Sequence, residues 1–415
     1  MRPNNLYPRY IRPRVMEALV DSPVVLIHGP RQSGKTTLSR LVGDELGFAY
    51  LSFDDDVQRA AAQSDPVGYV ADLPEQVILD EVQRVPELFT SLKTAVDARR
   101  EPGRFILTGS ASVLLIPRLA DSLAGRMDIL RLHPLAQAEL AGTDAGFLSA
   151  LFGAGFKTGV VGQRLGQALG NRMMSGGYPA ALTRTTARRR TAWYRNYVET
   201  LVQRDVRDLG RISSLDALPR LLTLAAGQTA CLLNVSDLAA PFQISRPTIR
   251  EYLTLLTRIF LMEELPPWHN NRLKRLIKTP KLHLSDTGLA GALLGLEGNA
   301  LWNDRALFGQ LLETFVYQEL RRQASWQEDA VFFSHFRDKD KVEVDLVLES
   351  GSTLAGVEVK AASTVTSDDF KGLRKLQSAA GEFFRAGVVL YDGGAVVPFG
   401  KNLYAVPISG LWENL

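Results

Sequence analysis

The sequence predicts an α/β protein with three parts: a parallel-sheet domain built around a P-loop, a helical middle region with a winged helix, and a second α/β domain. Three observations support this fold class. An apolar run at 24–27 leads through a glycine-containing loop into a helical pattern. Residues 232–286 alternate short helical and strand-like patterns, and after residue 305 a long amphipathic helix precedes alternating strands. Because 415 residues exceed what a single core usually serves, several domains are expected.

Composition limits the class of protein. Charged residues make up 22% of the chain and hydrophobic residues 46%, which is typical of folded globular proteins rather than disordered ones. The formal net charge is only +3, so any affinity for nucleic acid must come from local basic patches. The single cysteine, Cys231, cannot form an internal disulfide, which favours a cytoplasmic protein. No apolar stretch approaches the length of a membrane span, so no membrane partner is expected.

The glycine-containing loop predicts a phosphate-binding site. Its glycines allow backbone N–H groups to curl around an anion, and the helix that follows adds its positive dipole end. Lys35 would reach the β- and γ-phosphates, and the hydroxyl of Thr36 would bind Mg²⁺. The expected cofactors are therefore ATP and Mg²⁺. The expected nucleotide-binding residues are Gly29, Pro30, Arg31, Gln32, Ser33, Gly34, Lys35, Thr36, Thr37 and Thr108.

The segments around the P-loop continue an alternation of helices and strands. Residues 11–20 repeat apolar positions at a helical period, and 49–53 have the apolar character of a second strand. Three acids follow at 54–56. They could approach a metal ion, but a helix start is favoured, because acids are stabilised near the N-terminus of a helix.

A third apolar strand, at 76–79, leads into two adjacent acids, Asp80 and Glu81. This is the pattern that a P-loop requires as a partner. Asp80 would hold Mg²⁺ indirectly, through the groups that coordinate the ion, and Glu81 would polarise the attacking water. Together with Lys35, these acids are the predicted catalytic residues of ATP hydrolysis.

Further along, a strand at 104–112 ends in small hydroxyl residues, and Thr108 or Ser110 could contact the γ-phosphate at the carboxyl ends of the strands. A Ser/Thr cap of the next helix is an equally good interpretation. Arg126, with Arg118 as a second choice, is a candidate γ-phosphate contact in cis or in trans, and a contact in trans would require an oligomer. The alternative is an ordinary solvated surface arginine.

The ordered motifs resemble a known group of proteins. They are GPRQSGKT, the strand-end LDE, LTGSAS, LAGR, GGYP at 176–179 and QRDV at 203–206. This set is similar to the prokaryotic AAA_14 ATPases with a DUF4143 C-terminal region. The resemblance implies an AAA+-like ATPase domain in which Thr108 takes the sensor position, a winged-helix element, and a C-terminal domain related to PD-(D/E)XK nucleases. It implies no settled biological role. The predicted domains are 1–140 (ATPase), 141–215 (helical connector), 216–290 (winged helix) and 300–415 (nuclease-like).

The middle of the chain offers two basic surfaces. Arginines at 184–195 are interleaved with Trp193, Tyr194 and Tyr197, which suits nucleic-acid stacking, although a helix with one solvated and one packed face is the more common arrangement. In the predicted winged helix, a helix capped by Ser245 follows a short helix at 235–239, and strands at 261–265 and 281–284 form a hairpin. DNA would be contacted by Arg246, Thr248 and Arg250 and by the hairpin tip at 272–278. An intramolecular or protein contact is an equal alternative.

The C-terminal domain carries a second set of candidate catalytic residues. On an alternating strand, Asp345 shares a face with Glu343, and Glu358 shares a face with Lys360 on the next strand. Carboxylates from paired strands can converge on a second Mg²⁺ or on Mn²⁺, and a lysine beside them can orient a water. The pattern looks like the PD-(D/E)XK core, in which Asp345 and Glu358 would bind the metal. Glu313 matches the helix acid of that family. A charged hairpin edge facing water is the alternative.

These predictions lead to two functional hypotheses. The first is an ATP-hydrolysing protein whose nucleotide cycle controls a winged-helix and nuclease-like domain on DNA. The alternative is an ATP-dependent regulatory switch in which the C-terminal domain has no catalytic activity and docks on a protein partner.

Overall fold

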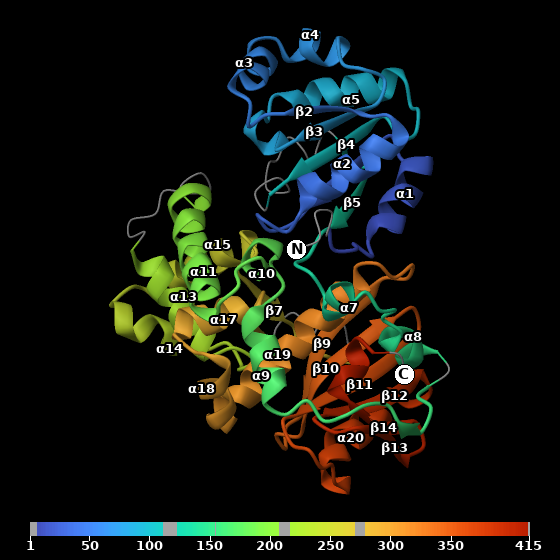
Figure 1. Cartoon of the computed structure of the whole chain (residues 1–415), viewed down its shortest axis with the longest axis vertical. Helices are drawn as coiled ribbons and strands as arrows, with labels where there is room; N and C mark the ends of the chain where they lie inside the picture. The colour runs from blue at the N-terminus through green and yellow to red at the C-terminus, as the bar shows by residue number, and fades with distance from the viewer. Residues whose placement is uncertain (1–5, 111–122, 154, 207–215, 270–278, 414–415) are drawn as a thin grey trace. The chain divides into compact units, whose positions relative to one another are not determined.

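The computed structural model describes residues 6–110, 123–153, 155–206, 216–269 and 279–413 (Figure 1). The chain forms two compact units. The P-loop unit contains Pro8–Leu135 and Arg258–Phe260, and the C-terminal unit contains Met1–Tyr7, Ala136–Thr257 and Leu261–Leu415. The four domains expected from the sequence stay predictions, because this division does not test the boundaries within the C-terminal unit.

A five-stranded parallel sheet forms the centre of the P-loop unit. Its strand order is β2-β3-β4-β1-β5. Every residue of β1, β3 and β4 is buried, in agreement with the continuous apolar sequences that parallel strands require. The parallel sheet expected from the sequence is therefore confirmed. Its strands are β1 (Val24–His28), β2 (Ala49–Ser52), β3 (Val77–Asp80), β4 (Phe105–Gly109) and β5 (Met127–Arg131).

Helices connect the parallel strands. Asp55 caps one of them, α3, where its carboxylate accepts the N–H groups of Val57 at 2.8 Å and Gln58 at 3.0 Å. The acids at 54–56 thus form the helix start that the sequence favours. The helical elements of this unit are α1 (Arg12–Asp21), α2 (Lys35–Leu46), α3 (Asp56–Ser64), α4 (Pro66–Ala71), η1 (Val82–Arg84) and α5 (Leu88–Ala98).

A separate short segment, Arg258–Phe260, belongs to the P-loop unit through the ring of Phe260. This ring lies 5.8 Å from the ring of His28 at the end of β1, and the guanidinium of Arg131 lies 4.6 Å from its centre. Phe260 also has a left-handed backbone conformation, with φ of 59°. The end of β1 is therefore covered by a residue that is distant in the sequence.

The first part of the C-terminal unit is mainly helical. In it, α15 is followed by the antiparallel hairpin of β7 and β8, with Met262 opposite Leu284. These elements lie where the sequence places the helices and hairpin of a winged helix, whose assignment stays a prediction. The main elements are α7 (Gln137–Ala141), α8 (Phe147–Phe152), α9 (Gln167–Ser175), α10 (Pro179–Leu182), α11 (Ala187–Leu201), α13 (Ala217–Gly227), α14 (Val235–Ala239), α15 (Arg246–Arg258), β7 (Met262–Leu265), β8 (Lys281–Leu284), α17 (Thr287–Leu294) and α18 (Gly298–Asn303).

A seven-stranded mixed sheet forms the second part of this unit. Its order is β6-β13-β14-β12-β11-β10-β9, with β9, β10 and β11 in an antiparallel meander and β12 parallel to β11. The long helix α19 (Arg305–Ala324) precedes the meander, and α20 (Lys371–Ala380) connects β11 to β12. The strands are β6 (Gly159–Val160), β9 (Val331–Arg337), β10 (Glu343–Ser350), β11 (Thr353–Lys360), β12 (Phe384–Tyr391), β13 (Ala395–Gly400) and β14 (Leu403–Pro407).

A buried polar network explains the GGYP motif. The carboxylate of Asp286 accepts the backbone N–H of Gly177 at 2.7 Å, the hydroxyl of Tyr194 at 2.9 Å and a guanidinium N–H of Arg322 at 3.1 Å. A Cβ on Gly176, where φ is +66°, would lie 2.0 Å from the Tyr194 hydroxyl, so only glycine fits. The motif therefore has a structural role, joining α11 and α19 to the segment before α17.

The aromatic residues of α11 pack beside this network rather than facing solvent. Tyr194 and Tyr197 are buried, and the ring of Trp193 stacks on that of Tyr197 with centroids 5.0 Å apart. Arg188, Arg189 and Arg195 are exposed. The helix thus has one packed aromatic face and one solvated basic face, as the more common arrangement predicts.

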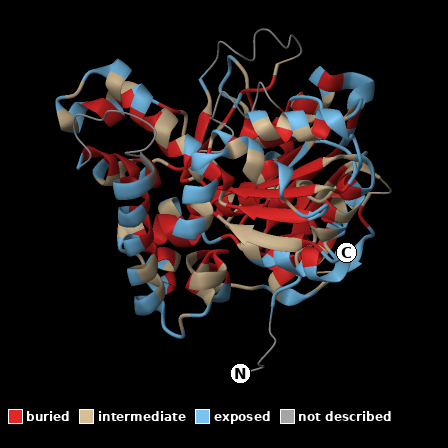
Figure 2. Ribbon diagram, turned by 90° about the horizontal axis from the view of Figure 1, so that it is seen from above, coloured by how far each residue is buried: buried red, intermediate tan, exposed pale blue. Residues whose placement is uncertain are grey.

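Burial follows the elements of both units. Figure 2 shows buried residues concentrated on strands and inner helix faces, and exposed residues on outer helix faces and loops. Among the residues that the structure describes, no helix combines the length and the apolar character needed to cross a membrane.

Candidate functional site

The P-loop lies between the end of β1 and the start of α2. Gly29, with φ of +150°, passes so close to the segment just after β5 that a Cβ would be 2.2 Å from the carbonyl oxygen of Leu132. Gly34 has φ of +99° and precedes Lys35, the first residue of α2. Both glycines are required by the backbone, and the loop carries its N–H groups to the N-terminus of a helix.

Lys35 lies over the loop with its side chain buried. Its ammonium donates hydrogen bonds to the carbonyl oxygens of Gly29 at 3.1 Å and Pro30 at 3.0 Å. Both acceptors are neutral. An anionic phosphate oxygen is a stronger acceptor for an ammonium than a carbonyl is, so these bonds can be exchanged for contacts to a nucleotide.

Arg9 supports the loop from outside the motif. Its two terminal guanidinium nitrogens donate to the carbonyl oxygens of Ser33 and His133, each at 2.6 Å. The guanidinium group therefore connects the P-loop to the segment that follows β5. Arg9 was not predicted, and the basic N-terminal stretch is the one feature of the sequence that could have suggested it.

Asp80, at the end of β3, is the centre of the polar cluster beside the P-loop. The hydroxyl of Thr36 lies 3.1 Å from both of its carboxylate oxygens, the hydroxyl of Tyr50 donates at 2.8 Å, and the hydroxyl of Thr108 also donates to it. Burial and the bond to Asp80 raise the pKa of Tyr50 to about 12. Hydroxyl and carboxylate oxygens are the ligands that Mg²⁺ prefers, so Thr36 and Asp80 fit the expected ion. Tyr50 was not predicted.

Glu81 follows Asp80 in a left-handed backbone conformation, with φ of 59°. Its N–H donates to the hydroxyl of Thr108 at 3.3 Å, and its carboxylate accepts the side-chain amide of Gln83. The same amide lies 3.2 Å from the hydroxyl of Ser110. Thr108 and Ser110 are thus beside the two acids, as predicted from the strand ends, and Gln83 is an addition that no sequence pattern indicated.

Arg126 lies elsewhere in the unit. It precedes β5, which runs parallel to β1 with Met127 opposite Val24. Arg126 is therefore at the amino-terminal end of the strands, whereas the P-loop follows the carboxyl end of β1. Its guanidinium forms two hydrogen bonds with the carboxylate of Asp97, at 2.7 and 2.9 Å. A γ-phosphate contact in the same chain does not agree with this placement, and a contact in trans stays a prediction. Arg118, the second choice, lies outside the described residues.

The acids predicted in the C-terminal domain come together in the C-terminal unit. Glu313 from α19 and Asp345 from β10 share one partner, the ammonium of Lys281 on β8, at 2.7 Å and 3.2 Å. All three side chains are buried or nearly so. Burial and the neighbouring Asp345 carboxylate raise the pKa of Glu313 well above its ordinary value. Lys281 was predicted only as part of a hairpin strand, and its partnership with the acids was missed.

Glu358 and Lys360 lie beside this pair on β11. The Lys360 ammonium donates to Glu358 Oε1 at 2.9 Å, and the second oxygen of Asp345 accepts the N–H of Val359 at 3.0 Å. Burial, followed by the Asp345 carboxylate, raises the pKa of Glu358 to about 8. The four predicted residues therefore converge as expected, but with an internal cation among them.

A divalent metal ion does not fit this cluster as it stands. The position between Glu313 and Asp345 is bridged by the Lys281 ammonium, and both oxygens of Asp345 are engaged. Within the described ranges, no group of three or more His, Cys, Asp or Glu side chains is arranged to hold a metal ion. The expected second Mg²⁺ or Mn²⁺ gains no support from this geometry.

The residues expected to contact DNA are only partly described. Arg246 is exposed at the start of α15, the hydroxyl of Thr248 lies 2.8 Å from that of Ser245, and Arg250 forms an ion pair with Glu264 at 3.0 Å. The basic hairpin tip, with Arg272, Lys274, Arg275 and Lys278, lies outside the described residues. Arg246 is thus an exposed cation on this surface.

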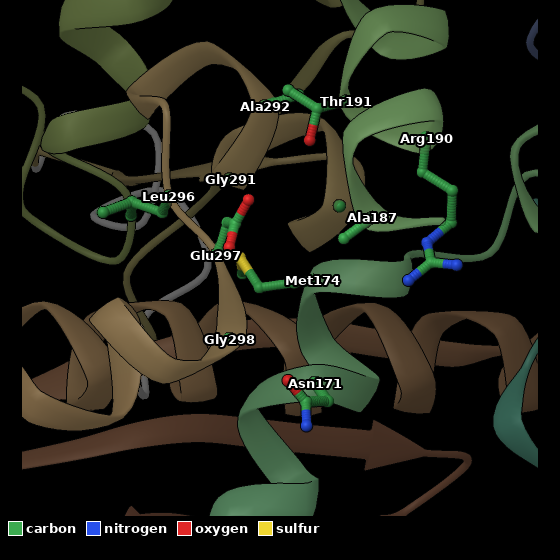
Figure 3. Close-up of a pocket in the computed structure, with 11 residues that line it drawn as sticks. Asn171, Met174, Ala187, Arg190, Thr191, Gly291, Ala292, Leu296, Glu297 and Gly298 are labelled. Atoms are coloured by element: carbon green, nitrogen blue, oxygen red, sulfur yellow. The ribbon is translucent and has the colours of Figure 1, made fainter. Parts of the chain in front are cut away.

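A small cavity of about 80 Å³ lies between α9, α11 and α17 (Figure 3). Met174 points toward Gly291 and Glu297, and its sulfur lies 2.3 Å from the position of a Cβ on Gly291. The cavity lies apart from the predicted site residues. It is lined by Asn171, Met174, Ala187, Arg190, Thr191, Gly288, Gly291, Ala292, Leu296, Glu297 and Gly298.

Three family models match successive parts of the chain. The AAA domain AAA_14 matches residues 21–141, a domain of unknown function, DUF8612, matches 166–300, and another, DUF4143, matches 308–411. The uncharacterized proteins Rv2008c of Mycobacterium tuberculosis and Mb2031c of Mycobacterium bovis are each 30% identical to this chain over 396 residues. That alignment covers 95% of this chain and 82% of either relative.

Solved structures with similarity to the chain include a Walker-type ATPase and a branch migration motor. The Walker-type ATPase PABY2304 of Pyrococcus abyssi is 16% identical, with 70% of this chain and 97% of that chain covered and a TM-score of 0.45. The RuvB Holliday junction branch migration motor of Thermotoga maritima is 19% identical, with 64% and 93% covered and a TM-score of 0.31.

Proposed function

The chain belongs to the family of proteins that combine the AAA domain AAA_14 with a C-terminal DUF4143 domain, and from this premise we propose that it binds Mg²⁺·ATP at the P-loop and hydrolyses it with Asp80 and Glu81. The observation that carries the proposal is the position of Asp80. Its carboxylate receives the hydroxyls of Thr36 from the P-loop helix and Thr108 from β4, so three elements meet where the phosphates would lie.

Binding would use the loop backbone and one charge. The N–H groups of the P-loop, from Gly29 to Thr37, would surround the phosphates, with Pro30, Arg31, Gln32 and Ser33 forming the wall of the cradle. The Lys35 ammonium would leave its two carbonyl partners for phosphate oxygens. When bound, Mg²⁺ offsets negative charge on the phosphates. The Thr36 hydroxyl would coordinate the ion, and Asp80 would hold the Thr36 hydroxyl in place.

Hydrolysis would depend on the placement of a water. The Glu81 carboxylate would accept a proton from that water, and the left-handed turn at Glu81 separates its direction from that of Asp80. Thr108, which contacts both acids, would report the state of the γ-phosphate. These roles divide the two adjacent acids between ion binding and water activation.

Two variants test this proposal. Lys35→Ala removes the charge-assisted phosphate contact, and we expect ATP affinity to fall about 10- to 150-fold, which corresponds to ~1.5–3 kcal/mol. Glu81→Gln keeps the shape of the site, so we expect ATP binding to persist while turnover is lost. Isothermal titration calorimetry and phosphate release measure these effects, with the exposed Lys401→Ala as the control. Unchanged ATP affinity in Lys35→Ala would contradict the proposal.

We further propose that the ATP-bound or ADP-bound state of the P-loop unit controls how the winged-helix and nuclease-like parts of the C-terminal unit act on DNA. Its support is the exposed Arg246 at the N-terminus of α15, the position from which a recognition helix meets DNA, and the resemblance to families with a winged helix and a nuclease-like domain. The metal-dependent nuclease activity stays a prediction, and it requires that Lys281 leave the acids. A cytoplasmic location also stays a prediction.

The second candidate function is a regulatory switch whose C-terminal domain is catalytically silent and docks on a protein partner. The observation that favours it is the Lys281 bridge, which occupies the acids that a nuclease would need. Fluorescence anisotropy with duplex DNA distinguishes the candidates. DNA binding that depends on ATP and is weakened in Arg246→Glu, but not in Arg189→Glu, supports action on DNA. Equal or absent binding in both variants supports the switch.

A further inference from the structure

The acid cluster of the C-terminal unit contains a cation of its own. Lys281 is only 4% exposed, and its ammonium contacts one carboxylate oxygen of Glu313 and one of Asp345. The three residues come from β8, α19 and β10, which are far apart in the sequence. A single lysine therefore connects the hairpin to the helix and strand that carry the predicted nuclease acids.

The backbone of β8 holds Lys281 in this position. Lys281 is paired with Leu265 on β7 and forms a bridge with Leu232 on its other side. The neighbouring Leu282 donates its N–H to the carbonyl of Cys231 at 2.9 Å. Because main-chain hydrogen bonds flank the strand, the ammonium is fixed by the fold rather than by a flexible loop.

The charges of the cluster are nearly balanced. With every group ionised, Glu313, Asp345 and Glu358 contribute three negative charges and Lys281 and Lys360 two positive ones. The raised pKa values of Glu313 and Glu358 remove part of the negative charge, so the two ammonium groups already neutralise the cluster. A divalent ion on the same oxygens would lie within a few ångströms of the Lys281 ammonium. Like charges at such a separation in a buried site repel strongly, so the ammonium and a metal ion exclude each other.

We propose that Lys281 is the resident cation of the C-terminal acid cluster and, by pairing with Glu313 and Asp345, excludes the divalent metal ion that Asp345 and Glu358 would otherwise bind. The wild-type chain then binds no divalent ion at this cluster. Removing the lysine side-chain charge leaves the carboxyl groups of Glu313, Asp345 and Glu358 without this cation, so a divalent ion can then bind among them. This inference does not depend on ATP hydrolysis.

Binding of Mn²⁺, followed by electron paramagnetic resonance on the full chain without nucleotide, tests the proposal. All proteins carry Thr36→Val, so that the P-loop does not contribute an ion. We expect this background and the same background with Asp345→Asn to bind Mn²⁺ equally weakly. Adding Lys281→Gln should tighten Mn²⁺ binding by at least about tenfold, and adding Asp345→Asn to that variant should abolish the gain.

Two results would overturn the proposal. One is Mn²⁺ binding in the background that Asp345→Asn removes, because a metal would then share the cluster with Lys281. The other is a folded Lys281→Gln variant with no gain in affinity. Lys281→Arg, which keeps the charge, is the matched control and should also show no gain. Where Lys281→Gln does not fold, the melting temperature of the Thr36→Val background is measured with and without Mn²⁺. If Mn²⁺ raises the melting temperature and Asp345→Asn abolishes that increase, the proposal is overturned. If Mn²⁺ does not raise it, the proposal is supported.

Discussion

The chain places a buried lysine beside acidic residues twice, with different partners. In the P-loop unit, Lys35 donates to two neutral carbonyl oxygens, and the nearby Asp80 accepts only neutral hydroxyls among the bonds described above. In the C-terminal unit, Lys281 donates directly to the carboxylates of Glu313 and Asp345. The first arrangement keeps cation and anion apart, whereas the second lets them neutralise each other.

This difference shows what distinguishes a site that awaits a ligand from one that is already satisfied. Neutral partners can be exchanged for a phosphate or a metal ion without breaking an ion pair. The Lys281 bridge can be replaced only by separating charges that are buried together, and an uncompensated buried charge is costly. Similar residue types therefore give an open site in one unit and a closed one in the other.

The sharpest way to break the comparison is to replace each lysine by methionine, which keeps the length of the side chain. We expect Lys281→Met to lower the free energy of unfolding by about 3–5 kcal/mol, because two buried carboxylates lose their cation. Lys35→Met should lower it by clearly less, about 1 kcal/mol, because the bonds described for its ammonium go to neutral carbonyl oxygens. Urea unfolding followed by circular dichroism measures both.

The double variant Lys281→Met with Glu313→Gln supplies the control. Removing one of the two acids should restore part of the lost stability, because fewer uncompensated charges remain. If Lys281→Met and Lys35→Met lower the free energy of unfolding equally, the two lysines contribute equally to stability, and the proposed difference between the two sites is wrong.

Stability is also expected to depend on pH, with opposite signs in the two units. The pKa of Glu358 is raised from 4.5 to about 8, so between these values the folded state holds a proton that the unfolded state has lost. Stability should then fall as pH rises through this window, by up to about 1.4 kcal/mol per pH unit. Burial, and then the charge of Arg131, lowers the pKa of His28 from 6.5 to about 3, so the P-loop unit should lose stability as pH falls below 6.5.

Thermal unfolding of Glu358→Gln and His28→Gln across this pH range separates the two contributions. Relative to wild type, Glu358→Gln should lose the decline toward high pH, and His28→Gln should lose the decline toward low pH. A Glu358→Gln variant with the same pH profile as wild type would contradict the buried, partly protonated carboxyl.

Local patterns predicted the P-loop unit more completely than the C-terminal cluster. The P-loop, Asp80 and Thr108 lie at the ends of adjacent parallel strands, and that topology follows from apolar runs and glycines that are visible in the sequence. Tyr50 and Gln83 were missed because a hydroxyl or an amide within a strand or turn carries no pattern of its own. Nothing local in the sequence indicates at which end of the strands Arg126 lies, so its γ-phosphate contact in trans stays a prediction.

Asp345 and Glu358 were predicted from the two-residue spacing on their strands, and Glu313 from the resemblance to a nuclease family, but the ionic partners of these acids could not be predicted. Whether Glu313 and Asp345 face water, a metal or a lysine depends on Lys281 of β8, which is 32 and 64 residues away from them in the sequence, respectively. Such a contact forms only when hairpin, helix and strand pack together. The GGYP motif is similar, because its role became clear only from Asp286, 109 residues beyond Gly177.

The order in which the chain visits its two units limits how the protein can be divided. The chain passes between units after Tyr7, Leu135, Thr257 and Phe260, so no single cleavage separates them into intact parts. A fragment that ends at residue 140 would keep the whole parallel sheet but lose Phe260, whose ring covers His28 just before the P-loop. The end of β1 is completed only after the chain has passed through α15, so a ribosome must synthesise well over half of the protein before the P-loop unit has all of its residues.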